Sequence, residues 1–140
     1  MNSWLCKEEI NPEQYYGFVY KIVNLETGKF YVGKKAFFHN KKKKLTKKEI
    51  AEHSGVGRKP TTRTDKVDSG WQSYWGSSKE LIADVKQLGE DKFRRFILKF
   101  AKNKKQLTFF ELQQQIEDKV LFIDSYNDNI AGKYFRKDFV

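Results

Sequence analysis

Two short runs rich in aromatic and β-branched residues, joined by a glycine-containing turn, constrain the fold of this chain more than any other feature. The first extends from Tyr16 to Val23 and the second from Lys29 to Gly33, with residues 24–28 between them. Runs of this kind separated by a few turn residues predict a β-hairpin. A third run, Phe93–Phe100, has several charges between its apolar residues, and together with the flanking elements it predicts a further strand.

Three stretches have helical features. Residues 46–49 form a capping box and predict a short helix that ends near His53. Ser77 or Ser78 can cap a second helix, in which apolar residues recur at helical spacing until Gly89 ends it. From residue 103 to about 123 one apolar stripe predicts a third helix: Phe109, Leu112, Ile116, Val120 and Ile123.

The connecting segments are polar. Residues 1–14 form an N-terminal lead, and residues 54–69 have the composition of a mobile loop that orders against a ligand. No repeat or domain boundary interrupts the chain. We therefore expect a single domain over residues 1–140, with a basic insertion over 36–76 that carries the short helix and the loop.

Positive charge is concentrated in one third of the chain. The chain has 28 Lys and Arg against 18 Asp and Glu, a net charge of +10, and the segment Lys29–Lys66 carries all of this excess. Clustered positive charge attracts polyanions, which makes nucleic acid the first partner to consider. The alternative is that Lys41–Lys44 is only a solvated loop.

Several other classes of protein are disfavoured. The longest apolar runs, such as Val120–Ile123, are far shorter than the roughly 20 residues of a membrane-spanning helix. A single cysteine, Cys6, excludes an intramolecular disulfide, and two histidines with it do not make a zinc site. We therefore expect no membrane contact and a protein of the reducing cytoplasm.

The paired motifs Gly17-Phe18-Val19-Tyr20 and Tyr31-Val32-Gly33-Lys34 resemble those of GIY-YIG nucleases. The resemblance is greatest to the phage SegE-like branch, which is related to homing endonucleases. It covers nearly the whole chain, because later segments are also similar: Trp71–Ser78, Leu81–Gly89, Phe93–Leu98, Glu111 and Tyr126-Asn127.

The resemblance implies an α/β (α+β) fold, with a small three-stranded antiparallel sheet flanked by helices. It also implies a Mg²⁺- or Mn²⁺-dependent DNA endonuclease in which Tyr20 activates water beside Tyr31, Glu111 holds the metal, and Asn127 supports the site. We expect Lys34 or Lys35, together with a nearby cation, to lower the pKa of Tyr20, and the site to lie beside a cationic groove. Taken alone, Glu111 lies off the apolar stripe and reads as a solvated carboxylate.

The chain departs from the family pattern at one position. Relatives place an arginine some eight residues after the second motif, where this chain has Lys41. Lysine lacks the planar fork of arginine, so we expect Lys35 or Arg58 to take over the contact with phosphate. The residues expected to bind DNA are Lys41, Lys42, Lys43, Lys44, Lys47, Lys48, Arg58, Lys59 and Arg63.

Two alternatives to the nuclease stay open. One is a non-catalytic nucleic-acid-binding protein that retains the fold and the basic surface, and the other is a protein-interaction role. Trp71, Tyr74 and Trp75 either pack in the core or stack on bases. We expect double-stranded DNA as the substrate, and a homodimer would allow cleavage of both strands. A phage-encoded enzyme would act in the host cytoplasm.

Overall fold

The computed structural model of the chain describes residues 3–52, 57 and 60–139. Within them the strands are β1 (Trp4–Leu5), β2 (Gly17–Asn24), β3 (Phe30–Ala36), β4 (Phe38–Lys44), β5 (Thr62–Asp68), β6 (Phe93–Ala101), β7 (Asn129–Ile130) and β8 (Tyr134–Phe135). The α-helices are α1 (Lys47–Ala51), α2 (Lys79–Leu88) and α3 (Lys104–Glu117), and short 3₁₀ helices cover Trp71–Ser73, Glu90–Lys92 and Arg136–Phe139. None of the described helices combines the length and the hydropathy that crossing a membrane requires.

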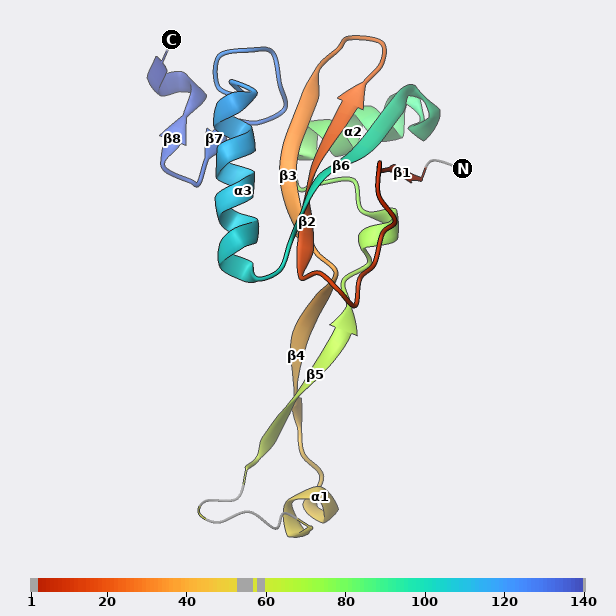
Figure 1. The fold of residues 1–140 in the computed structure, drawn as a ribbon, viewed down its shortest axis with the longest axis vertical. Helices are drawn as coiled ribbons and strands as arrows, with labels where there is room; N and C mark the ends of the chain where they lie inside the picture. Colours follow the sequence, from red (N-terminus) through yellow and green to blue (C-terminus); the bar gives the residue numbers. More distant parts are fainter. Residues whose placement is uncertain (1–2, 53–56, 58–59, 140) are drawn as a thin grey trace. The chain divides into compact units, whose positions relative to one another are not determined.

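The described chain forms two compact units, of which Phe38–Ser69 is one and the rest is the other. The larger unit is built on a four-stranded sheet with the order β1-β6-β2-β3 (Figure 1). β2 and β3 form the predicted hairpin, and β6 pairs antiparallel with the other side of β2, as a third strand. The mixed α+β class is therefore confirmed, while the sheet gains a fourth strand: β1, from the N-terminal lead, pairs parallel with β6.

One face of the sheet packs against α3. Val19 and Val32 point to this face and meet Leu107 of the helix in a cluster of buried apolar side chains. Figure 1 shows α3 running beside the β2–β3 hairpin. The hairpin is thus fixed against the helix that carries Glu111.

The opposite face is aromatic. Phe18 and Tyr20 point to it, and both are almost completely buried. The sequence did not decide whether Trp71, Tyr74 and Trp75 pack in the core or stack on bases. All three make ring contacts in this layer: Trp71 with Phe18 and Phe37, Tyr74 with Tyr20, and Trp75 with Phe93. In this structure the three rings pack within the protein.

Two of the predicted helices begin where expected. Thr46 caps α1 in a full capping box with Glu49, and Ser78 caps α2 by accepting from the backbone N–H of Leu81. Gly89 ends α2, as predicted. The predicted end of the first helix at His53 lies outside the described residues.

The prediction for the third helix was correct in its start and only partly correct in its buried face, since Leu112 and Val120 of the predicted stripe pack in the core. Asn103 caps α3, which ends at Glu117 rather than near residue 123. Phe109 and Ile116 of the predicted stripe are each 60% exposed, whereas Leu107 and Gln115 are buried. The face of α3 that meets the sheet follows residues 107, 111 and 115, one helical turn apart, and therefore includes Glu111.

The smaller unit is a two-stranded antiparallel ribbon, β4–β5, with α1 between its strands in the sequence. The lysine run 41–44 is part of β4, so these residues form a strand and not the loop of the alternative, although their side chains are exposed as it expected. The predicted polar loop over 54–69 is also wrong for residues 62–68, which form β5. Threonines at 62 and 64 favour a strand, a preference that the polar composition masked.

Candidate active site

The two predicted tyrosines meet on one face of the β2–β3 hairpin. The centroids of the Tyr20 and Tyr31 rings lie 6.1 Å apart. The register places Tyr20 opposite Gly33, where an added Cβ would lie 2.4 Å from the Tyr20 hydroxyl oxygen. Because no side chain fits there, the glycine of the second motif is what lets the Tyr20 ring lie across β3.

The two tyrosines differ in access. Tyr20 is only 1% exposed, and Trp4 and Tyr74 pack edge-on against its ring. Tyr31 is partly exposed, and its hydroxyl oxygen lies 2.8 Å from Oγ of Ser77. Tyr31 lines a surface cleft, whereas Tyr20 lies beneath it.

This cleft has a volume of ≈ 840 Å³ and brings together three predicted site residues from distant parts of the chain. Tyr31 comes from β3, Glu111 from α3 and Asn127 from the segment after α3. The expected cationic groove is not found here. The charged side chains among the described residues that line the cleft are acidic Glu80, Glu111, Asp124 and Asp128 and basic Lys29, Lys79 and Arg136.

Glu111 is held at the edge of the cleft by its helix and by Lys34. Leu107 and Gln115, one turn away on either side, are buried, and the Glu111 side chain is 21% exposed. Nζ of Lys34 lies 3.9 Å from Oε1 of Glu111 and donates a hydrogen bond to Oγ1 of Thr108 at 3.0 Å. Burial raises the pKa of the Glu111 carboxyl, and the Lys34 ammonium offsets part of that rise.

The pKa values of the tyrosines shift upward. Burial raises the pKa of Tyr20 well above its ordinary value, and the neighbouring Tyr31 adds to this rise. Burial also raises the pKa of Tyr31, against an opposing hydrogen bond with Ser77. The predicted lowering of the Tyr20 pKa by lysines is therefore wrong, since burial dominates and the Lys35 ammonium lies over the Tyr74 ring at 4.2 Å.

Asn127 pairs with the free edge of the sheet. Its Oδ1 accepts from the backbone N–H of Val32 at 3.0 Å, and its Nδ2 donates to the Val32 carbonyl at 2.9 Å. Gln115 donates to the same carbonyl at 3.1 Å. Since Val32 adjoins Tyr31, these bonds hold the strand that carries the accessible tyrosine.

Arg136 is a residue of the cleft that sequence reasoning missed. Its guanidinium donates to a set of oxygens in the segment after α3: the carbonyls of Val120, Leu121, Ile123 and Asn127 and Oγ of Ser125. An arginine in a polar tail gives no sequence signal for this role. Because it bonds to the carbonyl of Asn127, it fixes the segment that supports β3.

The remaining predicted residues lie elsewhere. Lys35 contacts Tyr74 on the aromatic face and is not among the residues that line the cleft. Arg58 and Lys59 lie outside the described residues. The other expected DNA-binding residues belong to the smaller unit and are exposed: Lys41, Lys42, Lys43, Lys44, Lys47, Lys48 and Arg63.

Glu111 fits the needs of a divalent metal ion of the magnesium type. In the part of the chain that the structure describes, no three His, Cys, Asp or Glu side chains gather as a ready-made metal cage. Mg²⁺ usually keeps several water ligands and is held by one or two carboxylates together with substrate phosphates. A partly exposed carboxylate at the edge of an open cleft meets that requirement.

Comparison with known proteins identifies the family of the chain. A family model described as "Putative endonuclease segE, GIY-YIG domain" matches residues 4–138. No curated protein and no solved structure matches the chain in such comparisons. The match includes both strands of the hairpin, the helix with Glu111 and the segment with Asn127. The chain belongs to the SegE-type GIY-YIG endonuclease family.

Proposed function

We propose that the protein hydrolyses phosphodiester bonds of double-stranded DNA at this cleft, in a reaction that depends on a divalent metal ion. One observation carries the proposal: Tyr31, Glu111 and Asn127 come from three separate elements and share the lining of one cleft. A tyrosine, a carboxylate that holds the metal and an asparagine that supports the site are the groups that the family resemblance implies. Their convergence supports hydrolysis at this position.

Glu111 would hold Mg²⁺ or Mn²⁺. When bound, such an ion neutralises charge on the scissile phosphate and stabilises the departing oxygen. Lys34, 3.9 Å from the carboxylate, would keep Glu111 ionised and stand ready to contact the phosphate. Burial alone would favour the protonated form of Glu111, so this lysine matters for metal binding.

Access to the cleft favours Tyr31 over Tyr20 as the phenol that contacts the attacking water. Tyr31 lines the cleft, whereas Tyr20 is buried under β3. The raised pKa keeps the Tyr31 phenol protonated at neutral pH, so the phenol would orient the attacking water by hydrogen bonding. Tyr31 would act as a base only after losing its proton, which a nearby cation would favour. Tyr20 would then position Tyr31 through the ring contact.

Among the described residues that line the cleft, no arginine has a guanidinium available to replace the family arginine at the phosphate. The guanidinium of Arg136 is engaged by backbone carbonyls and a serine hydroxyl, which leaves Lys34, Lys35 or Arg58 for the phosphate. Lysine provides charge without bidentate geometry, so the clamp on the phosphate would be looser than in relatives with arginine.

The wider setting of the enzyme follows from the family resemblance. We extend the proposal to a phage-encoded protein that acts on DNA in the host cytoplasm. One cleft acts on one strand at a time, so cleavage of both strands would use a second copy as a homodimer, or rebinding.

A plasmid assay tests the proposal. Supercoiled DNA is incubated with the full chain, with Mg²⁺ or with EDTA, and the nicked form is measured. We expect nicking only with the metal, and a loss of about a hundredfold or more in rate in Glu111→Ala and in Tyr31→Phe. Glu117→Ala removes an exposed carboxylate from the end of the same helix and should leave the rate unchanged.

The second candidate is a DNA-binding protein without cleavage. The excess of carboxylates over basic side chains among the described residues that line the cleft favours it, because such a lining repels a polyanion. In this case the chain would bind DNA and produce no nick with any divalent metal. That outcome would refute hydrolysis at the cleft.

A further inference from the structure

The charge that attracts DNA lies outside the cleft. The smaller unit, residues 38–69, contains ten basic and four acidic residues, although the cleft lining in the larger unit has more acids than bases. Contacts between cationic side chains and phosphates dominate the affinity of proteins for DNA. Retention of DNA therefore depends on the smaller unit, in which β4 and β5 form the ribbon.

Packing within the ribbon accounts for Lys66 of β5, whose Nζ lies over the Phe38 ring at 4.1 Å, but not for the lysines of β4. Every side chain of β4 from His39 to Lys44 is exposed. Lys43 lies directly opposite Arg63, and like charges at that separation destabilise a strand pair. An isolated two-stranded ribbon is only marginally stable in water. Packing thus leaves the exposed lysines of β4 unexplained, and an anionic partner accounts for them.

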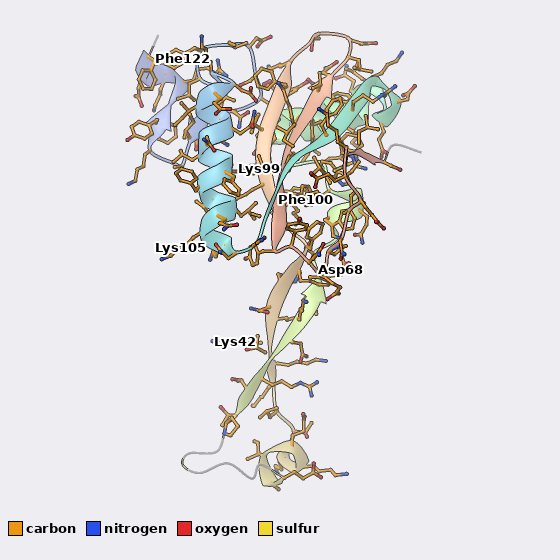
Figure 2. The ribbon with its side chains drawn as sticks, in the orientation of Figure 1. Lys42, Asp68, Lys99, Phe100, Lys105 and Phe122 are labelled. Carbon is orange, nitrogen blue, oxygen red and sulfur yellow. The ribbon has the colours of Figure 1, made fainter. Side chains whose placement is uncertain are left out.

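The register sorts the ribbon's side chains into two faces. One, the threonine face, consists of Phe38, Asn40, Lys42, Lys44, Thr62, Thr64, Lys66 and Asp68; the other, the arginine face, consists of His39, Lys41, Lys43, Arg63, Asp65 and Val67. Figure 2 shows the side chains that project from the two strands, with Lys42 labelled on β4. The two faces differ in their ion pairs: Nε of Arg63 lies 3.4 Å from Oδ1 of Asp65, within the arginine face.

Carboxylates neutralise the arginine face. Besides Asp65, Oε2 of Glu49 in α1 accepts a hydrogen bond from Nη1 of Arg63 at 2.8 Å. Asp65 and Val67 are also partly buried. The guanidinium best suited to a phosphate is therefore already engaged on this side of the ribbon.

The threonine face has the opposite character. Its residues Asn40, Lys42, Lys44, Thr62, Thr64 and Lys66 are exposed, and none of these six is acidic. Its one carboxylate, Asp68, lies opposite the partly buried Phe38 at the end of the ribbon. Amide, hydroxyl and ammonium groups alternate along it, and these are the groups that bond to phosphates and to the edges of bases. This face offers both charge and hydrogen-bonding capacity to a ligand.

We propose that the ribbon enters the major groove of duplex DNA with its threonine face toward the bases, and that this contact sets the site preference of the nuclease. The inference rests on the proposed function, which makes duplex DNA the substrate. The major groove, about 12 Å wide, admits a two-stranded ribbon whose strands are about 4.8 Å apart. Lys42 and Lys44 would contact phosphates, and Thr62 and Thr64 would contact base edges.

Two matched double variants test which face binds. K42A/K44A and K41A/K43A each remove two lysines from β4, at adjacent positions on opposite faces. Binding of the full chain to a labelled duplex is measured by fluorescence anisotropy in EDTA, at several salt concentrations. We expect K42A/K44A to weaken binding about tenfold or more and to reduce the salt slope by about 2, with less than about a threefold change in K41A/K43A.

Equal losses in the two variants would overturn the proposal, since they would mean that the ribbon acts only as diffuse charge. T62A/T64A should narrow the difference in affinity between duplex sequences and leave the salt slope unchanged. An RNA duplex should bind more weakly than DNA, because its major groove is deep and narrow. Equal affinity for the two duplexes would also contradict groove insertion.

The plasmid assay separates this inference from the proposed function. If the wild type nicks DNA while both lysine variants lose affinity equally, the assignment of the face is wrong and the nuclease stands. If binding depends on the threonine face but no metal supports nicking, the nuclease is wrong and the ribbon's role stands.

Discussion

Gly33→Ala should disturb the packing of the two site tyrosines more than any other small substitution in the hairpin. The added Cβ would lie 2.4 Å from Oη and 2.6 Å from Cζ of Tyr20, and 3.0 Å from Cε2 of Tyr31. Tyr20 cannot swing away, because Trp4 and Tyr74 pack edge-on against its ring. The substitution must therefore displace the ring or separate the strands.

Overpacking a tight core site costs about 1–3 kcal/mol, and a Cβ that meets a rigid ring belongs in the upper half of this range. A loss of about 2 kcal/mol would lower the melting temperature of a domain of this size by about 6 °C. Thermal unfolding followed by circular dichroism measures it. Gly28→Ala in the same hairpin is the control: nothing lies within 4 Å of its Cβ, so only the left-handed backbone, at about 1 kcal/mol, opposes the change.

The same substitution in a Tyr20→Leu background isolates the contact, because leucine lacks both of the nearest ring atoms. The destabilisation by Gly33→Ala should then fall by about 1 kcal/mol or more, a coupling typical of residues in contact. An equal loss in the two backgrounds would show that the Tyr20 ring does not lie across Gly33. The account of the second motif's glycine would then be wrong.

Three further outcomes follow from the site. Glu111 has a raised pKa in the folded protein, so the folded state gains stability as the pH falls through that pKa. Glu111→Gln should therefore raise the melting temperature at neutral pH, and this gain should vanish at acidic pH. No gain at neutral pH would contradict the burial of the charge. Arg136→Lys should lower the free energy of unfolding by about 2 kcal/mol, because one ammonium cannot bond to all the oxygens that the guanidinium contacts. The backbone amides after α3 should then exchange hydrogen faster. Unchanged exchange would refute the role of Arg136 in fixing this segment. Burial raises the pKa of Tyr126 to about 12, so ultraviolet titration should show one phenol that ionises only near that pH. The absorbance change of this phenol should be absent in Tyr126→Phe.

The sequence was most informative where the signals are local. The hairpin, the start of α2 at Ser78 and its end at Gly89 depend on turn residues and caps within a few positions of one another. Strand β1 could not be predicted in this way, since its two residues form a strand only by pairing with β6, about ninety positions away. The ribbon was missed because consecutive lysines are weak strand formers, and pairing with the threonines of β5 outweighs this preference.

The face of α3 shows why the site was only partly predictable. Apolar residues at 109, 112 and 116 suggested one stripe, but the helix turns Leu107, Glu111 and Gln115 toward the sheet. Gln115 belongs there because its amide pairs with the free edge of β3 at Val32, a requirement that hydrophobic patterning does not register. Without the family motif, Glu111 would have been taken for a surface carboxylate.

The upward shift of the tyrosine pKa values has a similar origin. Lysines adjacent in sequence suggested a lowered pKa for Tyr20, yet side chains alternate across a strand, so Lys34 points to α3 and Lys35 meets Tyr74. The depth of burial, which decides the sign of the shift, depends on Trp4 and Tyr74. These contacts exist only in the folded chain.

The most direct test of hydrolysis at the cleft is the single-turnover rate of DNA cleavage by Glu111→Ala, measured with the protein in excess and Mg²⁺ present, beside its affinity for the same duplex in EDTA. We predict that affinity stays within about threefold of the wild type, because the ribbon holds the DNA, while the rate falls by about a hundredfold or more. Cleavage by Glu111→Ala at the wild-type rate would contradict the assignment of the cleft as the catalytic centre.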